Sequence, residues 1–298
     1  MDHLATDILD QQSARRRLRD GVRKLPWYTL ATALAVIFGL PLFIMVITSL
    51  KAPESLYTRP FQWIPWDFQV ENYAEAWTAF PFTRYLINTL YVTGMGMIGA
   101  VVSTAAAGYA MARIRFPAAR VFFAILIASM LLPGEVTLIP EFVIWWRLGF
   151  VNTYVPLIVP GWLAAGAPKV FLMRQFFRTI PRDLDEAAKI DGATVPQRLR
   201  LIMAPLAKPA LGVVMILEFV SHWNKFVDPL IYLKDSDMYT LNVGLNMFRD
   251  AFSEELQSIP EMHLYMAIAT LIILPVLVIF IFLQRHFVEG IQLTGLKG

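Results

Sequence analysis

Four polar side chains that interrupt long apolar runs mark where this chain could do chemistry. Glu218, His222 and Asn224 stand at positions i, i+4 and i+6 of one run, and Glu135 follows a Pro-Gly pair in another. At about 100° per helical residue, Glu218 and His222 share one helix face and Asn224 points about 120° away. Because polar groups are costly in apolar surroundings, all four are candidates for lining a polar route. Hydrogen bonding between helices is the alternative for the first three, and an interfacial carboxylate is the alternative for Glu135.

Enzymatic chemistry finds no support in the residue patterns. The chain has no cysteine, and its four histidines are scattered, which excludes a thiol nucleophile and argues against a metal-ligand cluster. No G-x-x-x-x-G-K-[ST] sequence occurs, since Leu296 follows the second glycine of the nearest lookalike at 290–295. We predict no catalytic residue, no metal site and no nucleotide site. The net charge of +3 is too small to indicate a nucleic-acid binder.

The composition is typical of a membrane protein. Of 298 residues, 57% are apolar and 16% are charged, against about 45–50% and about 25% in soluble domains. Six runs have the length and apolar character of membrane spans. They cover residues 28–50, 88–109, 121–139, 154–173, 209–224 and 264–283. The sequence therefore predicts an all-α membrane protein with six transmembrane helices.

Three of the six predicted spans carry helix breakers or charges. The third contains Pro133 and Gly134 beside Glu135, the fourth contains three prolines and Lys169, and the fifth is short and carries Glu218. Proline removes a backbone donor and clashes with the preceding turn, so we expect broken or polar helices here. We interpret Lys169 as a side chain that snorkels to the membrane interface.

The distribution of charge predicts the orientation in the membrane. Segments 1–27, 110–120, 174–208 and the end beyond 283 hold 18 of the 26 lysines and arginines, whereas the alternate segments hold seven. By the positive-inside rule the first set is cytoplasmic, and so are both termini. Residues 1–27 form a cytoplasmic basic tail before an uncleaved anchor, and 28–298 form the transmembrane domain. Membrane lipid is an expected partner of the basic turns.

The cytoplasmic segment 174–208 is too long for a simple turn, and it contains residues that typically begin and end helices. Pro181 indicates a helix start, Gly192 a stop, and Thr194 with Gln197 a capping box that opens a second helix. We predict a helix, a glycine turn and a second helix.

The first of these helices has a small apolar face in projection. Leu184, Ala187 and Ala188 fall at i, i+3 and i+4, whereas Asp185 and Lys189 project elsewhere. Two uses of the helix pair stay open on physical grounds. It packs against the bundle and lipid head groups, or it docks to a cytoplasmic partner.

The same segment carries a recognisable motif. Residues 186–193, EAAKIDGA, followed by Gln197, Ile202 and Pro205, closely resemble the EAA loop of bacterial ABC importer permeases in its carbohydrate-importer form. Further short matches extend across nearly the whole chain. They include Ser49-Leu50-Lys51, Glu71-Asn72-Tyr73, Tyr109 to Arg113, Trp223-Asn224, Asp228-Pro229-Leu230 and residues 295–298. One departure is Ala204, where the family usually has leucine before the proline.

The resemblance implies an ABC type I importer permease fold in the bacterial inner membrane. It implies a non-catalytic subunit that forms half of the pathway for a carbohydrate or related polyhydroxylated solute. The implied partners are a second homologous permease subunit, two ATPase subunits that bind ATP and Mg, and an extracytoplasmic solute-binding protein. By similarity, the helix that couples to the ATPase includes Glu186, Ala187, Ala188, Asp191, Gly192 and Ala193.

A secondary transporter of small solutes is the competing interpretation. It calls for inverted repeats, of which the sequence shows no convincing example, and it leaves the loop motif unexplained. The aromatic-rich segment 55–77 is interpreted as an interfacial belt. The acidic segment 234–261 is expected to touch the binding protein, and the tail 295–298 either reaches the ATPases or ends in solvent.

The absence of native cysteine makes the predicted orientation directly testable. We expect Ser13→Cys to react with a membrane-impermeant maleimide only from the cytoplasmic face, and Ser236→Cys only from the outer face. Labelling of right-side-out and inside-out vesicles measures this. Reaction of both cysteines from one side would contradict the even number of spans.

Overall fold

A computed structural model describes residues 2–56, 62–79, 81–164, 166–254 and 261–295, and these ranges contain helices and no β-strand. The first half of the chain forms α1 (Asp2–Ser49), η1 (Pro53–Ser55), α2 (Glu71–Ala79), α3 (Phe82–Arg113), α4 (Ala119–Ser129), α5 (Gly134–Arg147), α6 (Val155–Trp162) and α7 (Ala167–Thr179). The second half forms α8 (Arg182–Ile190), α9 (Val195–Arg198), the π-helix η2 (Leu199–Met203), α10 (Ala204–Leu206), α11 (Lys208–Trp223), α12 (Val227–Tyr232), η3 (Ser236–Met238), α13 (Leu241–Glu254) and α14 (Met262–Gly295). The all-α prediction is confirmed.

The apolar helices account for the predicted spans. Four are long and apolar enough to cross a bilayer, and two further helix pairs qualify when each is counted as one broken span. The single spans are Pro26–Ser49, Phe82–Arg113, Val155–Thr179 and Met262–Phe282. The bent pairs are α4 with α5, at 108°, and Val195–Leu206 with α11, at 87°. Six spans result on that count, and the first bend falls at the predicted Pro-Gly break.

Two compact units divide the chain, residues 1–73 with 261–270 and residues 74–260 with 271–298. Within the first unit, the end of α1 is held to the start of α2. The amide of Asn72 donates to the carbonyls of Ser49 and Lys51 at 2.9 Å each, and Ser49 Oγ lies 2.7 Å from the Tyr73 hydroxyl. The short motifs at 49–51 and 71–73 therefore contact each other, and these contacts join the two ends of the segment between α1 and α2.

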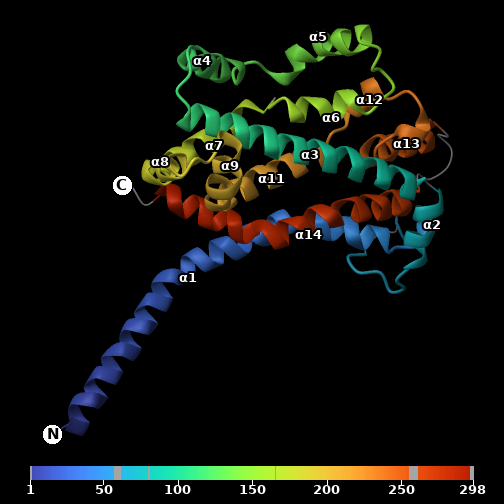
Figure 1. The fold of residues 1–298 in the computed structure, drawn as a ribbon. Coiled ribbons are helices and arrows are strands. Elements are labelled where there is room, and N and C mark those ends of the chain that lie inside the picture. The colour runs from blue at the N-terminus through green and yellow to red at the C-terminus, as the bar shows by residue number, and fades with distance from the viewer. Residues whose placement is uncertain (1, 57–61, 80, 165, 255–260, 296–298) are drawn as a thin grey trace. The chain divides into compact units, whose positions relative to one another are not determined.

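Helix α3 is the centre of the second unit and packs against α6, α7 and α11 (Figure 1). Its buried face is made largely of small residues, so neighbouring backbones approach closely. The small members are Thr89, Thr93, Gly96, Gly99, Ala100, Thr104, Ala105 and Gly108.

The crossing of α3 with α6 depends on glycine. A Cβ atom added to Gly161 would lie 2.7 Å from the carbonyl oxygen of Gly96, and one added to Gly99 would meet the Trp162 ring at 2.3 Å. Ser103 Oγ donates to the Gly161 carbonyl at 2.7 Å. Helix α6 therefore sits at a distance from α3 that a β-carbon at these positions would prevent.

The loop between α12 and α13 is fastened to the ends of α3 and α6. The Asn88 amide donates to the carbonyls of Asp237 and Tyr239 at 2.9 Å each, and Asn152 Oδ1 accepts from the backbone N–H of Lys234 and Asp235. Arg84 adds an exposed ion pair with Asp237. Only part of the predicted binding-protein segment 234–261 falls within the described residues, and its first turn is ordered by these contacts.

We expect Gly161→Ala to destabilise the protein, because the new methyl group must push backbone away from backbone between α6 and α3. Overpacking of this kind costs on the order of 1–3 kcal/mol. Gly94→Ala is the matched control, since a Cβ at Gly94 meets nothing within 4 Å. Thermal unfolding in detergent, followed by size-exclusion chromatography, measures both. Equal midpoints for the two variants would mean that the close crossing contributes nothing.

Candidate functional site

The segment 174–208 folds as the predicted helix, glycine turn and helix. Helix α8 begins after Pro181, and Gly192 has φ +81, a left-handed conformation that glycine adopts without strain. The backbone N–H of Thr194 donates to Gln197 Oε1 at 2.8 Å, as the capping box requires. The sequence therefore fixes both ends of the turn locally.

The faces of α8 differ from the sequence prediction. Ala188 and Asp185 are buried, whereas Leu184 is 44% and Ile190 is 87% exposed, and Ala187 is exposed as well. The apolar face predicted from Leu184, Ala187 and Ala188 is therefore divided, since only Ala188 packs inward. A charged residue turns inward because it finds a hydrogen-bond donor and a cation there, and this leaves the larger apolar side chains facing outward.

Asp185 is the residue that joins the loop to the bundle. The hydroxyl of Tyr109, near the end of α3, donates to Asp185 Oδ1 at 2.7 Å, and Arg198 Nη1, from α9, lies 3.1 Å from Oδ2. The side chains of Asp185 and Arg198 are each 11% exposed. A buried carboxylate is tolerated when it is paired and hydrogen-bonded, and removal of one partner is strongly destabilising. The helical pattern predicts only that Asp185 projects away from the apolar face, and it gives no signal of this role.

A second contact fixes the entry into the loop. Arg113 Nη2, at the last residue of α3, donates to the carbonyl of Phe177 at 2.6 Å and also to that of Ile180. These carbonyls belong to the end of α7 and its cap, which have no partner of their own within the helix. The end of α3 therefore holds both the start of the loop, through Arg113, and its first helix, through Tyr109.

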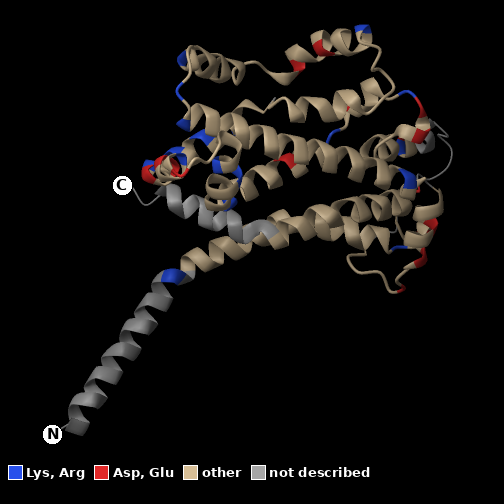
Figure 2. Cartoon of the chain, viewed as in Figure 1, with Lys and Arg blue, Asp and Glu red and all other residues tan. Residues whose placement is uncertain are grey.

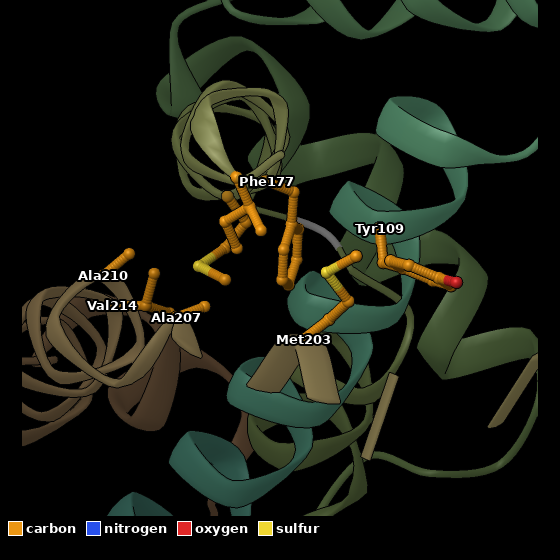
Figure 3. Packing of buried hydrophobic residues seen from close by; sticks show 8 residues of the cluster. Tyr109, Phe177, Met203, Ala207, Ala210 and Val214 are labelled. Carbon is orange, nitrogen blue, oxygen red and sulfur yellow. The ribbon is translucent and has the colours of Figure 1, made fainter. Parts of the chain in front are cut away.

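An apolar cluster lies beneath these polar contacts (Figure 3). Phe177 of α7 meets Tyr109 of α3 edge-on, with ring centroids 5.8 Å apart. Met203 of the π-helix and Val214 of α11 belong to the same cluster, and both are fully buried. The cluster thus joins α3, α7 and α11, three of the spans, to the segment that follows α9.

Inside the bundle, two of the four predicted pathway residues form part of one buried ion cluster. Glu218 Oε1 lies 2.6 Å from Lys169 Nζ, and Glu218 Oε2 lies 3.4 Å from His222 Nδ1, which also lies 3.0 Å from the Glu218 carbonyl. The Glu218 side chain is 4% exposed. The His222 ring packs on Gly96 of α3, where a Cβ would lie 2.4 Å from Nε2. These groups link α7, α11 and α3.

The prediction that Lys169 snorkels to the membrane interface is wrong. Its ammonium instead pairs with Glu218, across the contact between α7 and α11. The signal that could have found it is the need of an intramembrane carboxylate for a cation, since Lys169 is the one lysine or arginine that the charge count left inside the predicted spans.

The other two candidates lie apart from this cluster. Asn224 is exposed at the end of α11, and Glu135 is exposed in the first turn of α5, where its charge suits the helix dipole. Among the described residues, no three His, Asp or Glu side chains come together as metal ligands.

The four to six helices that are long and apolar enough to cross a bilayer define a multi-pass integral membrane protein. The family model for the binding-protein-dependent transport system inner membrane component matches residues 99–292, so the chain belongs to that family. It is a permease subunit of an ABC importer in the bacterial inner membrane, and it is not a catalytic subunit. Membership removes the support for a secondary transporter.

Three relatives and one solved structure show how far the similarity extends. The melibiose/raffinose/stachyose import permease MelC of Bacillus subtilis is 32% identical over 90% of this chain and 95% of its own. The arabinooligosaccharide permease AraQ of Halalkalibacterium halodurans is 29% identical (89% and 93% covered), and the sn-glycerol-3-phosphate permease UgpE of Escherichia coli O157:H7 is 28% identical (91% and 98% covered). A bacterial ABC transporter involved in alginate import has a chain that superposes with TM-score 0.78 at 25% identity, covering 90% of this chain and 97% of that one.

We expect Glu218→Gln to be strongly destabilising, because it leaves the partly buried Lys169 ammonium without its counter-charge. Breaking a buried pair costs about 3–5 kcal/mol, whereas replacing both partners with apolar residues of similar size is often close to neutral. The double variant Lys169→Met/Glu218→Met should therefore be more stable than Glu218→Gln. Thermal unfolding midpoints of the purified protein decide this. A double variant at least as unstable as the single one would show that the pair is not coupled.

Proposed function

We propose that this chain forms half of the pathway through which an ABC importer moves a carbohydrate or related polyhydroxylated solute. The second half is a homologous permease subunit, two ATPase subunits bind the ATP and Mg, and an extracytoplasmic binding protein delivers the solute. The relatives support this cargo class, because their names give melibiose, raffinose and stachyose, arabinooligosaccharides and sn-glycerol-3-phosphate.

Helix α8 is the proposed contact with the ATPase. Ala187, Ile190 and the carboxylate of Glu186 are exposed on it, beside the exposed charges of Asp183 and Lys189. The turn at Asp191 and Gly192 limits the helix to nine residues, and Ala193 closes it through an N–H bond to the Ala188 carbonyl at 2.9 Å. In this assignment Ala188 supports the helix from within, and Ala187 is the alanine that allows close approach of the partner.

The observation that carries the proposal is the buried Asp185 between Tyr109 and Arg198. A push on α8 is transmitted directly to α3 through the tyrosine and to α9 through the arginine. Helix α9 continues through the π-helix and Pro205 into α11, the span that bears Glu218. If the ATPases bind one arrangement of this loop more tightly than the other, their binding shifts the helix bundle from one state to the other.

The four pathway candidates divide by accessibility. Glu135 and Asn224 are exposed and available to hydroxyl groups of a solute, whereas Glu218 and His222 are buried in the ion cluster. The two buried groups reach a solute only if α7 and α11 separate. We therefore assign Glu135 and Asn224 to solute contact, and Glu218 with His222 to the joint between the helices.

Two single-cysteine variants of α8 test the proposal in the assembled complex. We expect Ala187→Cys to cross-link to a cysteine placed in the ATPase surface that receives α8, and Ala188→Cys, whose parent residue is 7% exposed, to fail. The two variants place the same thiol at adjacent positions of α8, so Ala188→Cys is the control for Ala187→Cys. Cross-linking at Ala188 alone would overturn the orientation of the helix.

The functional measurement in the same complexes is ATP hydrolysis stimulated by a loaded binding protein. Asp185→Asn keeps the size of the side chain but removes the charge that holds Arg198, so we expect fewer complexes to assemble and stimulation to fall in those that do. Unchanged stimulation with unchanged assembly would mean that the ATPase signal does not pass through Asp185.

A further inference from the structure

A cavity of about 510 Å³ opens beside the coupling loop. Its walls are the end of α3 with the residues that follow it, four residues of α8 and the start of α9. Five cationic side chains line it: Arg113, Arg115, Arg182, Lys189 and Arg198. Figure 2 shows lysines and arginines gathered around α8, α9 and the adjoining end of α3.

The cavity has an excess of positive charge. Its acidic lining residues are Asp185 and Glu186, which leaves three uncompensated cations. The charge of Asp185 is already taken up by Arg198, and Arg113 is bonded to neutral carbonyls. Within the described part of the chain, Arg115, Arg182 and Lys189 form no ion pair.

Hydrogen-bond donors are in excess as well. The Nε–H groups of Arg113 and Arg198 are buried and have no acceptor among the described residues. Guanidinium groups bind the oxygens of phosphate with two parallel hydrogen bonds, and ammonium groups bind them as point charges. A cavity with this many donors and so few acceptors suits a phosphate group.

The position of the cavity favours a lipid as the source of that phosphate. It lies where the apolar span α3 ends, and Ile114 and Val195 are among its apolar lining residues. Anionic phospholipids present phosphate at this level of the cytoplasmic leaflet, and each nearby lysine or arginine strengthens their binding by about 1 kcal/mol. The acidic side chains of an ATPase are less well placed, because Ala187 and Ile190, the exposed apolar residues proposed to meet the ATPase, do not line the cavity.

We propose that this cavity binds the phosphate of an anionic phospholipid, with Arg115, Arg182 and Lys189 around the head group. The proposal rests on the cytoplasmic assignment of segment 174–208 made above. The bound lipid neutralises the cations beside α8 and fixes the surface on which the ATPase docks. Lipid charge thereby becomes a determinant of coupling in this transporter.

The test uses the assembled transporter in phosphatidylcholine nanodiscs with and without phosphatidylglycerol. Lipid that stays bound after extraction is counted by native mass spectrometry. We expect Arg115→Gln/Arg182→Gln/Lys189→Gln to weaken phosphatidylglycerol retention by about tenfold or more. The matched control, Arg178→Gln/Arg200→Gln/Lys208→Gln, removes three exposed cations of the same segment that do not line the cavity, and its retention should equal that of the wild type.

Three results would overturn the proposal. Equal losses for the two triple variants would indicate diffuse surface charge. Displacement of the lipid by millimolar inorganic phosphate would indicate a site for the free anion. Unchanged retention with weakened ATPase assembly would make the cavity an ATPase contact. Retention of phosphatidylglycerol is measured independently of ATP hydrolysis. If the lipid is retained but the complex does not respond to binding protein, the result counts against the proposed function and not against the lipid site.

Discussion

The arrangement of the coupling loop depends on one buried carboxylate. Asp185 accepts a hydrogen bond from Tyr109 and pairs with Arg198, and its position sets which side of α8 faces the bundle. With Asp185 and Ala188 facing the bundle, Leu184 and Ala187 are exposed. The burial of this charge is tolerated because Tyr109 and Arg198 satisfy it, and removal of either partner would leave an uncompensated buried group.

The same constraint operates deeper in the bundle. Glu218 is held between Lys169 and His222 where α7, α11 and α3 meet, and the small residues of α3 let the neighbouring helices come close enough for these contacts. Close backbone packing supplies the dispersion contacts that apolar surface burial cannot supply in lipid. Polar pairing and glycine packing together make α3 the element to which both the loop and the ion cluster are attached.

Several features were predictable because their signals are local. The Pro133-Gly134 break, the left-handed Gly192 and the bond between Thr194 and Gln197 all follow from residues within a few positions of one another. The loop motif and the family were predictable too, since they are read directly as sequence. The snorkelling of Lys169 was wrong, and the burial of Asp185 was not predicted; in both cases a deciding partner lies far away in the chain.

The sequence by itself determined the helical class, the approximate spans, the punctuation of the loop and the absence of cysteine chemistry, since hydropathy, helix caps and composition require no knowledge of distant neighbours. Tertiary structure alone decided that Tyr109 meets Asp185 across 76 positions, that Lys169 meets Glu218, and that five cations surround one cavity. Periodicity specifies which side chains share a face of one helix. It does not specify which helix that face will meet. The pairing of buried charges is decided by these contacts between helices, which form only in the folded structure.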